Sequence, residues 1–121
     1  MIKTHARRKL GVRQAHRRSM LRSLATHLLH HEKITTTTAR AKELKAYTDR
    51  LVSRLKSIED PLRRTREVSR WLAPNGFEVD KKLLQIILPR YQARQGGVVR
   101  VIGLPPRLSD QAALSRVELV A

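Results

Sequence analysis

The chain has 121 residues, and its 26 lysines and arginines against 10 acidic residues give a formal net charge of +16. Because it has no cysteine, disulfides, thiolate zinc sites, iron–sulfur clusters and cysteine nucleophiles are excluded. No apolar stretch approaches the roughly 20 residues that a membrane span requires, and a hydrophobic content of 40% favours one folded domain over wholesale disorder.

The positive charge is concentrated at the N-terminus. Residues 1–23 hold eight basic side chains and no acid, and arginine outnumbers lysine 18 to 8 in the whole chain. A guanidinium makes paired hydrogen bonds to phosphate and stacks on bases, which lysine does not. An arm of this kind, without aromatic residues or an adjacent apolar face, favours a nucleic acid over a membrane surface. We expect residues 1–14 to form an extended arm that becomes ordered on RNA.

The next segments predict a helix, a strand and a second helix. Residues 15–31 carry leucines at helical spacing. The four threonines that follow Ile34 are β-branched, so they predict a short strand over 34–38. Thr38 is expected to cap the helix over 39–57 through its hydroxyl. The apolar stripe of this second helix consists of Leu44, Tyr47, Leu51, Leu55 and Ile58.

Two further helices follow. Asp60 before Pro61 is a strong helix start and predicts a helix over 61–73, which the sequence Pro74-Asn75-Gly76 ends. One side of it is expected to hold Leu62, Thr65, Val68, Ser69 and Leu72. Asp80 is expected to cap a fourth helix, and Pro89 to kink or tighten its end. The apolar stripe of that helix is Leu83, Leu84, Ile87, Leu88 and Tyr91.

The C-terminal part reads as a hairpin. Residues 98–102 and 114–120 are predicted strands, joined by a long polar loop that begins at Pro105. The fold class is therefore α+β, with about four helices packed on a small three-stranded mixed sheet and an extended basic N-terminal arm. Two regions are expected, an RNA-binding arm over 1–14 and a compact domain over 15–121.

Short segments along the whole chain carry a family resemblance. They are Arg8-Lys9-Leu10, His16-Arg17, Leu28-Leu29, Ile34, Thr36-Thr37, Ala41-Lys42-Glu43-Leu44, Leu51-Val52, Pro89-Arg90-Tyr91, Arg94 with Gly96-Gly97, Arg100, Ile102 and Val117-Glu118-Leu119-Val120. By their order and spacing the chain resembles the bacterial-type large ribosomal subunit protein seventeen family. One departure is Val98-Val99, where the family commonly has Tyr-Thr; it is expected to remove an aromatic or hydroxyl contact to RNA.

The resemblance implies a structural constituent of the large ribosomal subunit that binds and stabilises its ribosomal RNA near the exit of the nascent-chain tunnel. The implied partners are large-subunit ribosomal RNA and neighbouring large-subunit proteins, in a cytoplasmic or an organellar ribosome. Neither a membrane nor a small-molecule substrate is expected, and no cofactor.

The candidate RNA-binding residues combine the arm, the first two helices and a glycine loop. They are Lys3, His5, Arg7, Arg8, Lys9, Arg13, His16, Arg17, Arg18, Arg22, Arg40, Lys42, Arg90, Arg94, Gly96, Gly97 and Arg100. The Gly96-Gly97 loop is either a phosphate cradle or a plain turn. Arginines 63, 64, 66 and 70 form either a second RNA face or a solvated one, and Trp71 and Phe77 are expected to be packing residues.

Other functions find less support in the residues. No nucleophile, general-base or nucleotide-loop motif is present, so an enzyme is not expected. His27 and His31 are four residues apart on a helix, but they lack the further ligands that a metal needs. A small basic DNA-binding regulator or architectural protein is the alternative, although the connection over 56–61 lacks the short glycine-containing turn of helix-turn-helix modules.

Overall fold

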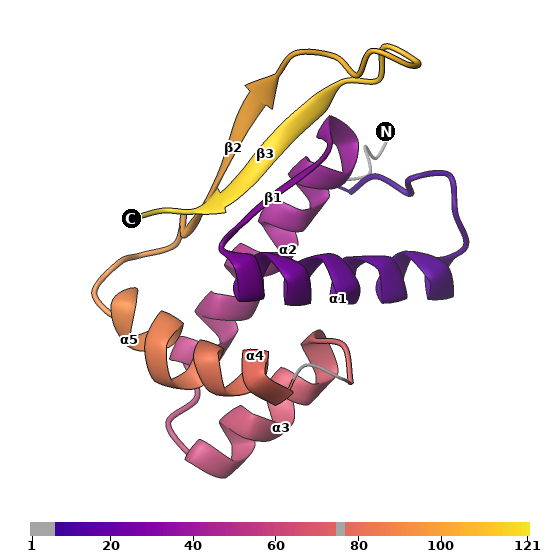
Figure 1. Cartoon of the computed structure of the whole chain (residues 1–121). Coiled ribbons are helices and arrows are strands. Elements are labelled where there is room, and N and C mark those ends of the chain that lie inside the picture. The colour runs from indigo at the N-terminus through magenta and orange to yellow at the C-terminus, as the bar shows by residue number, and fades with distance from the viewer. Residues whose placement is uncertain (1–6, 75–76) are drawn as a thin grey trace, which may run out of the picture.

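The structure is a computed structural model that describes residues 7–74 and 77–121. The predicted RNA contacts of Lys3 and His5, and the helix-ending residues Asn75 and Gly76, lie outside the described residues. Figure 1 shows the arrangement of the elements. The helix α1 (Gln14–His31), the strand β1 (Lys33–Thr37) and the helix α2 (Thr38–Lys56) follow one another, so the predicted helix, strand and helix of this half are confirmed.

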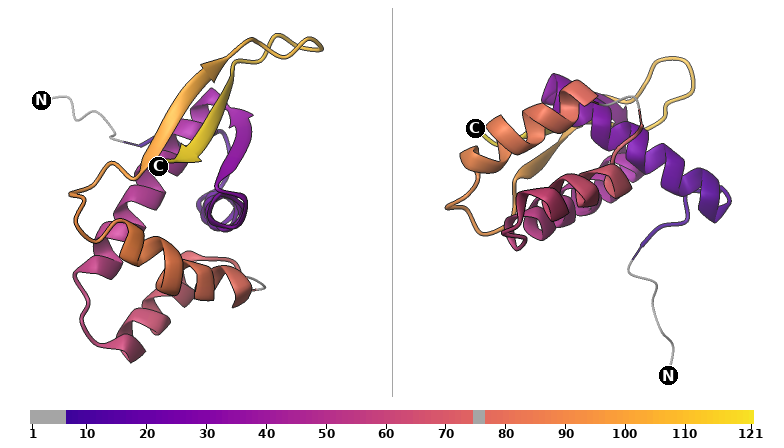
Figure 2. Two further views of the ribbon diagram at one scale, coloured as in Figure 1. Left: turned by 60° about the vertical axis from the view of Figure 1, so that its left-hand side comes forward. Right: turned by 90° about the horizontal axis from the view of Figure 1, so that it is seen from below.

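The second half contains the remaining helices and the hairpin. The helix α3 (Pro61–Trp71) precedes a continuous helical run of α4 (Phe77–Lys82), η1 (Leu83–Ile87) and α5 (Leu88–Arg90), and the strands β2 (Val99–Leu104) and β3 (Leu114–Leu119) end the chain. In two views α1 lies between the sheet and α4, and it contacts both (Figures 1 and 2). The loop between β2 and β3 projects away from the body.

The sheet is antiparallel throughout, with the strand order β1-β3-β2. The prediction of a mixed sheet is therefore wrong, whereas the α+β class is confirmed. The physical reason is that β3 turns back from β2 and then takes the central position. β1 and β2 run the same way, but they are never neighbours, so no parallel pair forms.

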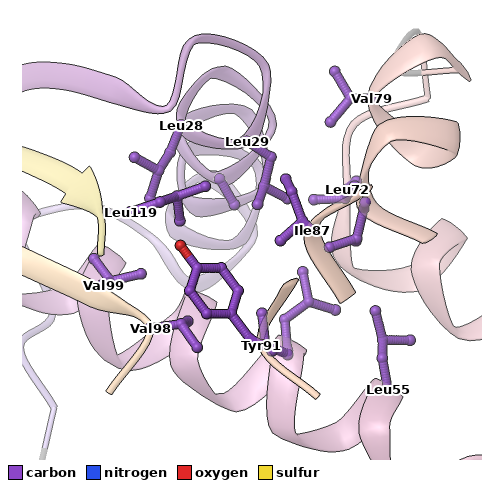
Figure 3. Close-up of a cluster of buried hydrophobic side chains, with 14 of the residues drawn as sticks. Leu28, Leu29, Leu55, Leu72, Val79, Ile87, Tyr91, Val98, Val99 and Leu119 are labelled. Atoms are coloured by element: carbon purple, nitrogen blue, oxygen red, sulfur yellow. The ribbon is translucent and has the colours of Figure 1, made fainter. Parts of the chain in front are cut away.

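The core lies where α1, the sheet and the helical run meet. Leu28 and Leu29 of α1 point toward Leu119, Ile87 and Tyr91, and all five are at most 8% exposed (Figure 3). Burying a large apolar side chain contributes about 1.5–3 kcal/mol. Val98 and Val99 are also buried, with 1% and 2% exposure. In this chain these two side chains belong to the core, so they are not available for a contact to RNA.

Three predicted local details are wrong. Thr38 does not cap α2: the capping position is Thr37, and the Thr38 hydroxyl lies 2.8 Å from that of Ser115 on β3. Asp80 does not cap a helix either, because α4 begins at Phe77 and Asp80 lies within it. In both cases the hydroxyl or carboxylate sits a residue or more inside the helix, where the N–H groups of the first turn are out of its reach.

The third wrong detail is the buried side of α3. Val68 and Leu72 are buried as predicted, but Leu62 is 59% exposed and Thr65 and Ser69 are also exposed. The hydroxyls of Thr65 and Ser69 donate to carbonyl oxygens four residues earlier in the same helix. The half-buried positions are instead Arg64, Glu67 and Trp71, so the helix is rotated toward a more polar face than the prediction assumed.

The Asp60-Pro61 signal behaves as predicted. At Pro89 the predicted tight turn forms at the helix end, where the N–H of Tyr91 donates to the carbonyl oxygen of Leu88, but a wider turn that was not predicted precedes it. Asp60 accepts a hydrogen bond from the Leu62 N–H at 3.1 Å and caps α3, with Pro61 at its first position. Before Pro89 the chain forms the π-helical segment η1, where the N–H of Leu88 donates to the carbonyl oxygen of Leu83. A proline has no N–H to donate, so the widened turn relieves the α-helical pattern at that place.

Candidate nucleic-acid interface

A basic groove lies where the N-terminal segment and three helices converge. It has a volume of about 930 Å³. Residues 7–13 turn back from the start of α1 toward α2 (Figure 1), and the main-chain N–H of Arg8 donates to Glu43 Oε1 at 3.0 Å. The residues that line the groove are Arg7, Arg8, Lys9, Gln14, Arg17, Arg18, Leu21, Arg22, Glu43, Tyr47, Arg50, Glu67, Arg70 and Trp71.

Each helix contributes one face to this groove. On α1 the lining positions from Gln14 to Arg22 are spaced three and four residues apart, which places them on one side of the helix. On α2 the same spacing joins Glu43, Tyr47 and Arg50. On α3 it joins Glu67, Arg70 and Trp71. Cations therefore approach the same space from three helices and from the segment before α1.

Arg22 differs from the other cations of the groove because it is used to hold the walls together. Its Nη2 donates to the carbonyl oxygens of Leu72 at 2.8 Å and Ser69 at 3.1 Å, and its Nε reaches Leu72 at 3.3 Å. These bonds join α1 to the C-terminal end of α3. Thr26 adds a second link, since its hydroxyl accepts from the Ala73 N–H. The groove is thereby a fixed feature of the fold.

Among the described residues, Glu32, Asp110 and Glu118 pair with arginines that lie outside the groove. Glu32 pairs with Arg90 at 3.3 Å and with Lys82 at 3.2 Å, and its pKa is lowered chiefly by the hydrogen bond from Arg90. Glu118 pairs with Arg100 through Nη2 at 2.5 Å, and this bond lowers the pKa of Glu118. The candidate cations Arg90 and Arg100 are thus partly neutralised within the protein.

Inside the groove the charge balance is different. Glu67 is the acidic residue with cationic partners there: Arg54 lies 3.5 Å and Arg70 3.9 Å from it. The Trp71 N–H is the main cause of the lowered pKa of Glu67. Within 7–74 and 77–121, no ion pair involves Arg17, Arg18 or Arg50. These cations remain available for an anionic partner.

Part of the predicted RNA-binding set meets in the groove, and part does not. The structure brings together Arg7, Arg8, Lys9, Arg17, Arg18 and Arg22. Outside it lie Arg13, His16, Arg40, Lys42, Arg90, Arg94, Gly96, Gly97 and Arg100, whose contact with RNA remains a prediction. Sequence reasoning left out Arg50 and Tyr47, although the three-residue spacing that joins them on α2 was a usable signal.

The Gly96-Gly97 loop is a left-handed turn with internal anchors. Both glycines have positive φ, +69° and +62°, a region that side chains with a Cβ rarely adopt. The N–H of Val99 donates to Asp49 Oδ1 at 3.1 Å, and Lys56 Nζ donates to the carbonyl oxygen of Arg94. These bonds fasten both ends of the loop to α2.

A metal site and a membrane-spanning helix are two further features for which the described residues can be searched. His27 and His31 have stacked rings with centroids 6.3 Å apart, and His31 also contacts His30. No group of three or more potential metal-ligating side chains occurs in the part of the chain that is described. Over the same part, no helix is both long and apolar enough to cross a bilayer.

Comparison with known proteins gives a consistent result. A family model described as Ribosomal protein L17 matches residues 20–120. The chain is 38% identical over 120 residues to the large ribosomal subunit protein bL17 of Endomicrobium trichonymphae, with 99% of each chain covered. It is 44% identical over 115 residues to the bL17 protein of Desulfitobacterium hafniense, covering 95% of this chain and 99% of that one. It is also 36% identical over 120 residues to the large ribosomal subunit protein bL17m of Schizosaccharomyces pombe, covering 99% of this chain and 58% of that protein.

Proposed function

The chain belongs to the ribosomal protein L17 family, and from this premise we propose that it binds and stabilises large-subunit ribosomal RNA through the basic groove. Membership confirms the family resemblance of the sequence and makes the chain a structural protein of the large ribosomal subunit, not an enzyme. The proposal adds that the protein contacts the RNA through the basic groove.

The observation that carries the proposal is the distribution of unpaired arginines. Glu118 pairs with an arginine of the sheet and Glu32 with one of α5, whereas Arg17, Arg18 and Arg50 in the groove have no carboxylate partner among the described residues. Cations held close together repel one another, and a polyanion relieves this repulsion. Each phosphate that they neutralise also releases condensed counterions, which favours binding at low salt.

The body behind the groove supplies rigidity. Buried apolar residues of α1, α2 and α3 belong to one core cluster, which holds the three helices that line the groove, and Arg22 joins two of them. Folded ribosomal RNA presents phosphates from several strands at once, so a rigid set of cations can connect them. Residues 1–14, with Lys3 and His5, would extend this contact as an arm between RNA helices.

The proposed location is near the exit of the nascent-chain tunnel, beside other large-subunit proteins. The family resemblance supports this location. The ribosome concerned is expected to be cytoplasmic, and an organellar ribosome is the alternative because the relatives include both bL17 and bL17m proteins.

The test compares two charge-matched double variants. Arg18→Gln with Arg50→Gln removes two groove cations, and Arg63→Gln with Arg66→Gln removes two exposed cations of α3 that do not line the groove. Binding to large-subunit ribosomal RNA is measured as a function of salt. If the intact protein engages on the order of 8–10 phosphates, a plot of the logarithm of the binding constant against the logarithm of the salt concentration has a slope of about −6 to −9. The groove variant should reduce the magnitude of this slope by about 1.4–1.8.

The control variant is expected to bind and to enter large subunits nearly as the unaltered protein does. Comigration with subunits through a high-salt gradient gives the second readout. Equal losses in the two variants would assign the effect to net charge alone and contradict a role for the groove. Preferred binding to a sequence-selected DNA duplex over ribosomal RNA would favour a DNA-binding regulator instead.

A further inference from the structure

One wall of the groove is aromatic. Tyr47 of α2 and Trp71 of α3 have ring centroids 5.1 Å apart, with their planes inclined by 58°. Both rings are half-buried and both line the groove. Tyr91, by contrast, is only 3% exposed and belongs to the core. The sequence predicted that Trp71 packs, and it does pack on Tyr47, but part of its surface stays open to the groove.

The polar atoms of this pair are already satisfied inside the protein. The Tyr47 hydroxyl donates to the carbonyl oxygen of Trp71 at 2.6 Å, and Trp71 Nε1 donates to Glu67 Oε1 at 3.1 Å. Burial raises the pKa of Tyr47, so the ring stays neutral at physiological pH. What the pair offers to the groove is therefore ring surface, which binds by stacking and by apolar contact.

Phosphate binding alone does not explain why an aromatic pair lines one side of the groove. An anion needs donors and positive charge, which the surrounding arginines supply. A partly exposed aromatic pair among arginines is the combination on which unpaired bases stack while their phosphates are neutralised. Sites that hold small ligands commonly have volumes of about 300–1,000 Å³, so the groove is large enough for a nucleotide, while a double helix is far too wide to enter it.

We propose that the groove receives one unstacked nucleotide of ribosomal RNA, with its base against Trp71 and Tyr47 and its flanking phosphates on Arg18 and Arg50. This inference rests on the proposed RNA-binding function and makes it specific, because it requires a bulged or looped-out nucleotide at the contact. Every base has a stacking face, so the identity of the base is of minor importance and its presence is decisive.

The experiment uses the fact that Trp71 is the one tryptophan of the chain. The full-length protein is titrated with an RNA hairpin that carries a single bulged adenosine and, separately, with the same hairpin carrying an abasic nucleotide at the bulge. The two probes have the same charge and differ only in the base. The readouts are the dissociation constant and the tryptophan fluorescence.

The bulged adenosine is expected to quench Trp71 and to bind about 5- to 150-fold more tightly than the abasic probe. Trp71→Leu should remove most of this difference between probes, and Trp71→Phe should keep part of it because a ring remains. Arg63→Gln, at an exposed position of α3 that does not line the groove, should leave the difference unchanged. Since the two probes are also compared on the unaltered protein, a variant that fails to fold does not decide the result.

Equal affinity for the two probes, or equal fluorescence with both, overturns the proposal and leaves a groove that binds phosphates only. That result keeps the RNA-binding function intact. Failure to bind either hairpin at low salt is a different outcome, because it contradicts the basic-groove contact on which both proposals rest.

Discussion

Arg22 of α1 donates from Nη2 to the carbonyl oxygen of Leu72 at 2.8 Å, across fifty residues of sequence. The same nitrogen reaches Ser69, so one guanidinium holds the last turn of α3 against α1. This side chain was a candidate RNA contact from the sequence. In the structure its donors serve first to assemble the groove, which separates it from Arg18 nearby on the same helix.

This difference predicts that two similar substitutions affect different properties, the stability of the fold in one case and RNA binding in the other. Arg22→Gln should lower the free energy of unfolding by about 1–3 kcal/mol, since charge-assisted bonds to two carbonyl oxygens are lost. Arg18→Gln should change it by no more than about 0.5 kcal/mol and weaken RNA binding instead. Urea unfolding and RNA titration of both variants check this, and comparable stabilities for the two would contradict the structural role of Arg22.

Glu32 joins α1 to Lys82 and Arg90, and Glu32→Gln should remove both ion pairs. The Glu32 side chain is 36% exposed, so solvent screening limits the loss to about 1 kcal/mol. Because the pKa of Glu32 is lowered in the folded protein, its contribution is present above the usual value of 4.5 and is lost as the pH falls through the folded pKa.

The measurement for Glu32 is urea unfolding at about pH 7 and about pH 3. The difference between the unaltered protein and the variant should shrink at the lower pH and at high salt. Glu59→Gln is the matched control, since Glu59 is exposed and has no ion pair among the described residues. A loss of stability that is the same at both pH values would contradict this role of the charge.

For Asp80 we expect a pH dependence of stability with the opposite sign to that of Glu32. Its Oδ1 is buried without a hydrogen-bond partner in the described part of the chain, and burial raises the pKa of the carboxyl above 3.8. A raised folded pKa means that protonation favours the folded state at low pH, and this stabilisation is lost as the pH rises through the folded pKa. Asp80→Asn should therefore be more stable than the unaltered protein at neutral pH, by less than about 1 kcal/mol.

The advantage of Asp80→Asn should disappear in acid, because the unaltered carboxyl is then also neutral. Thermal unfolding between about pH 3 and pH 7 measures this. An advantage that does not depend on pH would show that the charge of Asp80 is not its cause.

A substitution at Gly97 tests whether the backbone of the Gly96-Gly97 loop requires a residue without a Cβ. A Cβ at this position would meet nothing within 4 Å, but φ is +62°, so Gly97→Ala should cost about 1–2 kcal/mol of stability through backbone strain alone. Gly103→Ala is the control: it also has open space, and its φ lies outside the left-handed region. Equal urea midpoints for the two variants would mean that the loop can relax without strain.

Local sequence signals determined most of the secondary structure. Leucine spacing predicted α1 and α2, and Asp60-Pro61 predicted the start of α3. The apolar segment 98–102 and the alternating segment 114–120 predicted the hairpin. Each of these signals depends on neighbours a few residues apart. The same signals misled at Thr38 and Asp80. A residue of a capping type marks a helix start only if the chain begins the helix just after it, and here α2 begins at Thr38 itself and α4 begins three residues before Asp80.

The tertiary structure alone decided which cations are free. In the sequence, Arg18, Arg22 and Arg100 are equivalent positive charges, and nothing local distinguishes them. Folding places a carboxylate beside Arg100 and two carbonyl oxygens beside Arg22, while Arg18 faces the groove. Residue spacing fixes which side chains share a helix face, but which faces meet depends on contacts between segments that are fifty residues apart or more. For this reason the charge of the chain pointed to a polyanion, and only the packing of α1, α2 and α3 located the surface that can receive it.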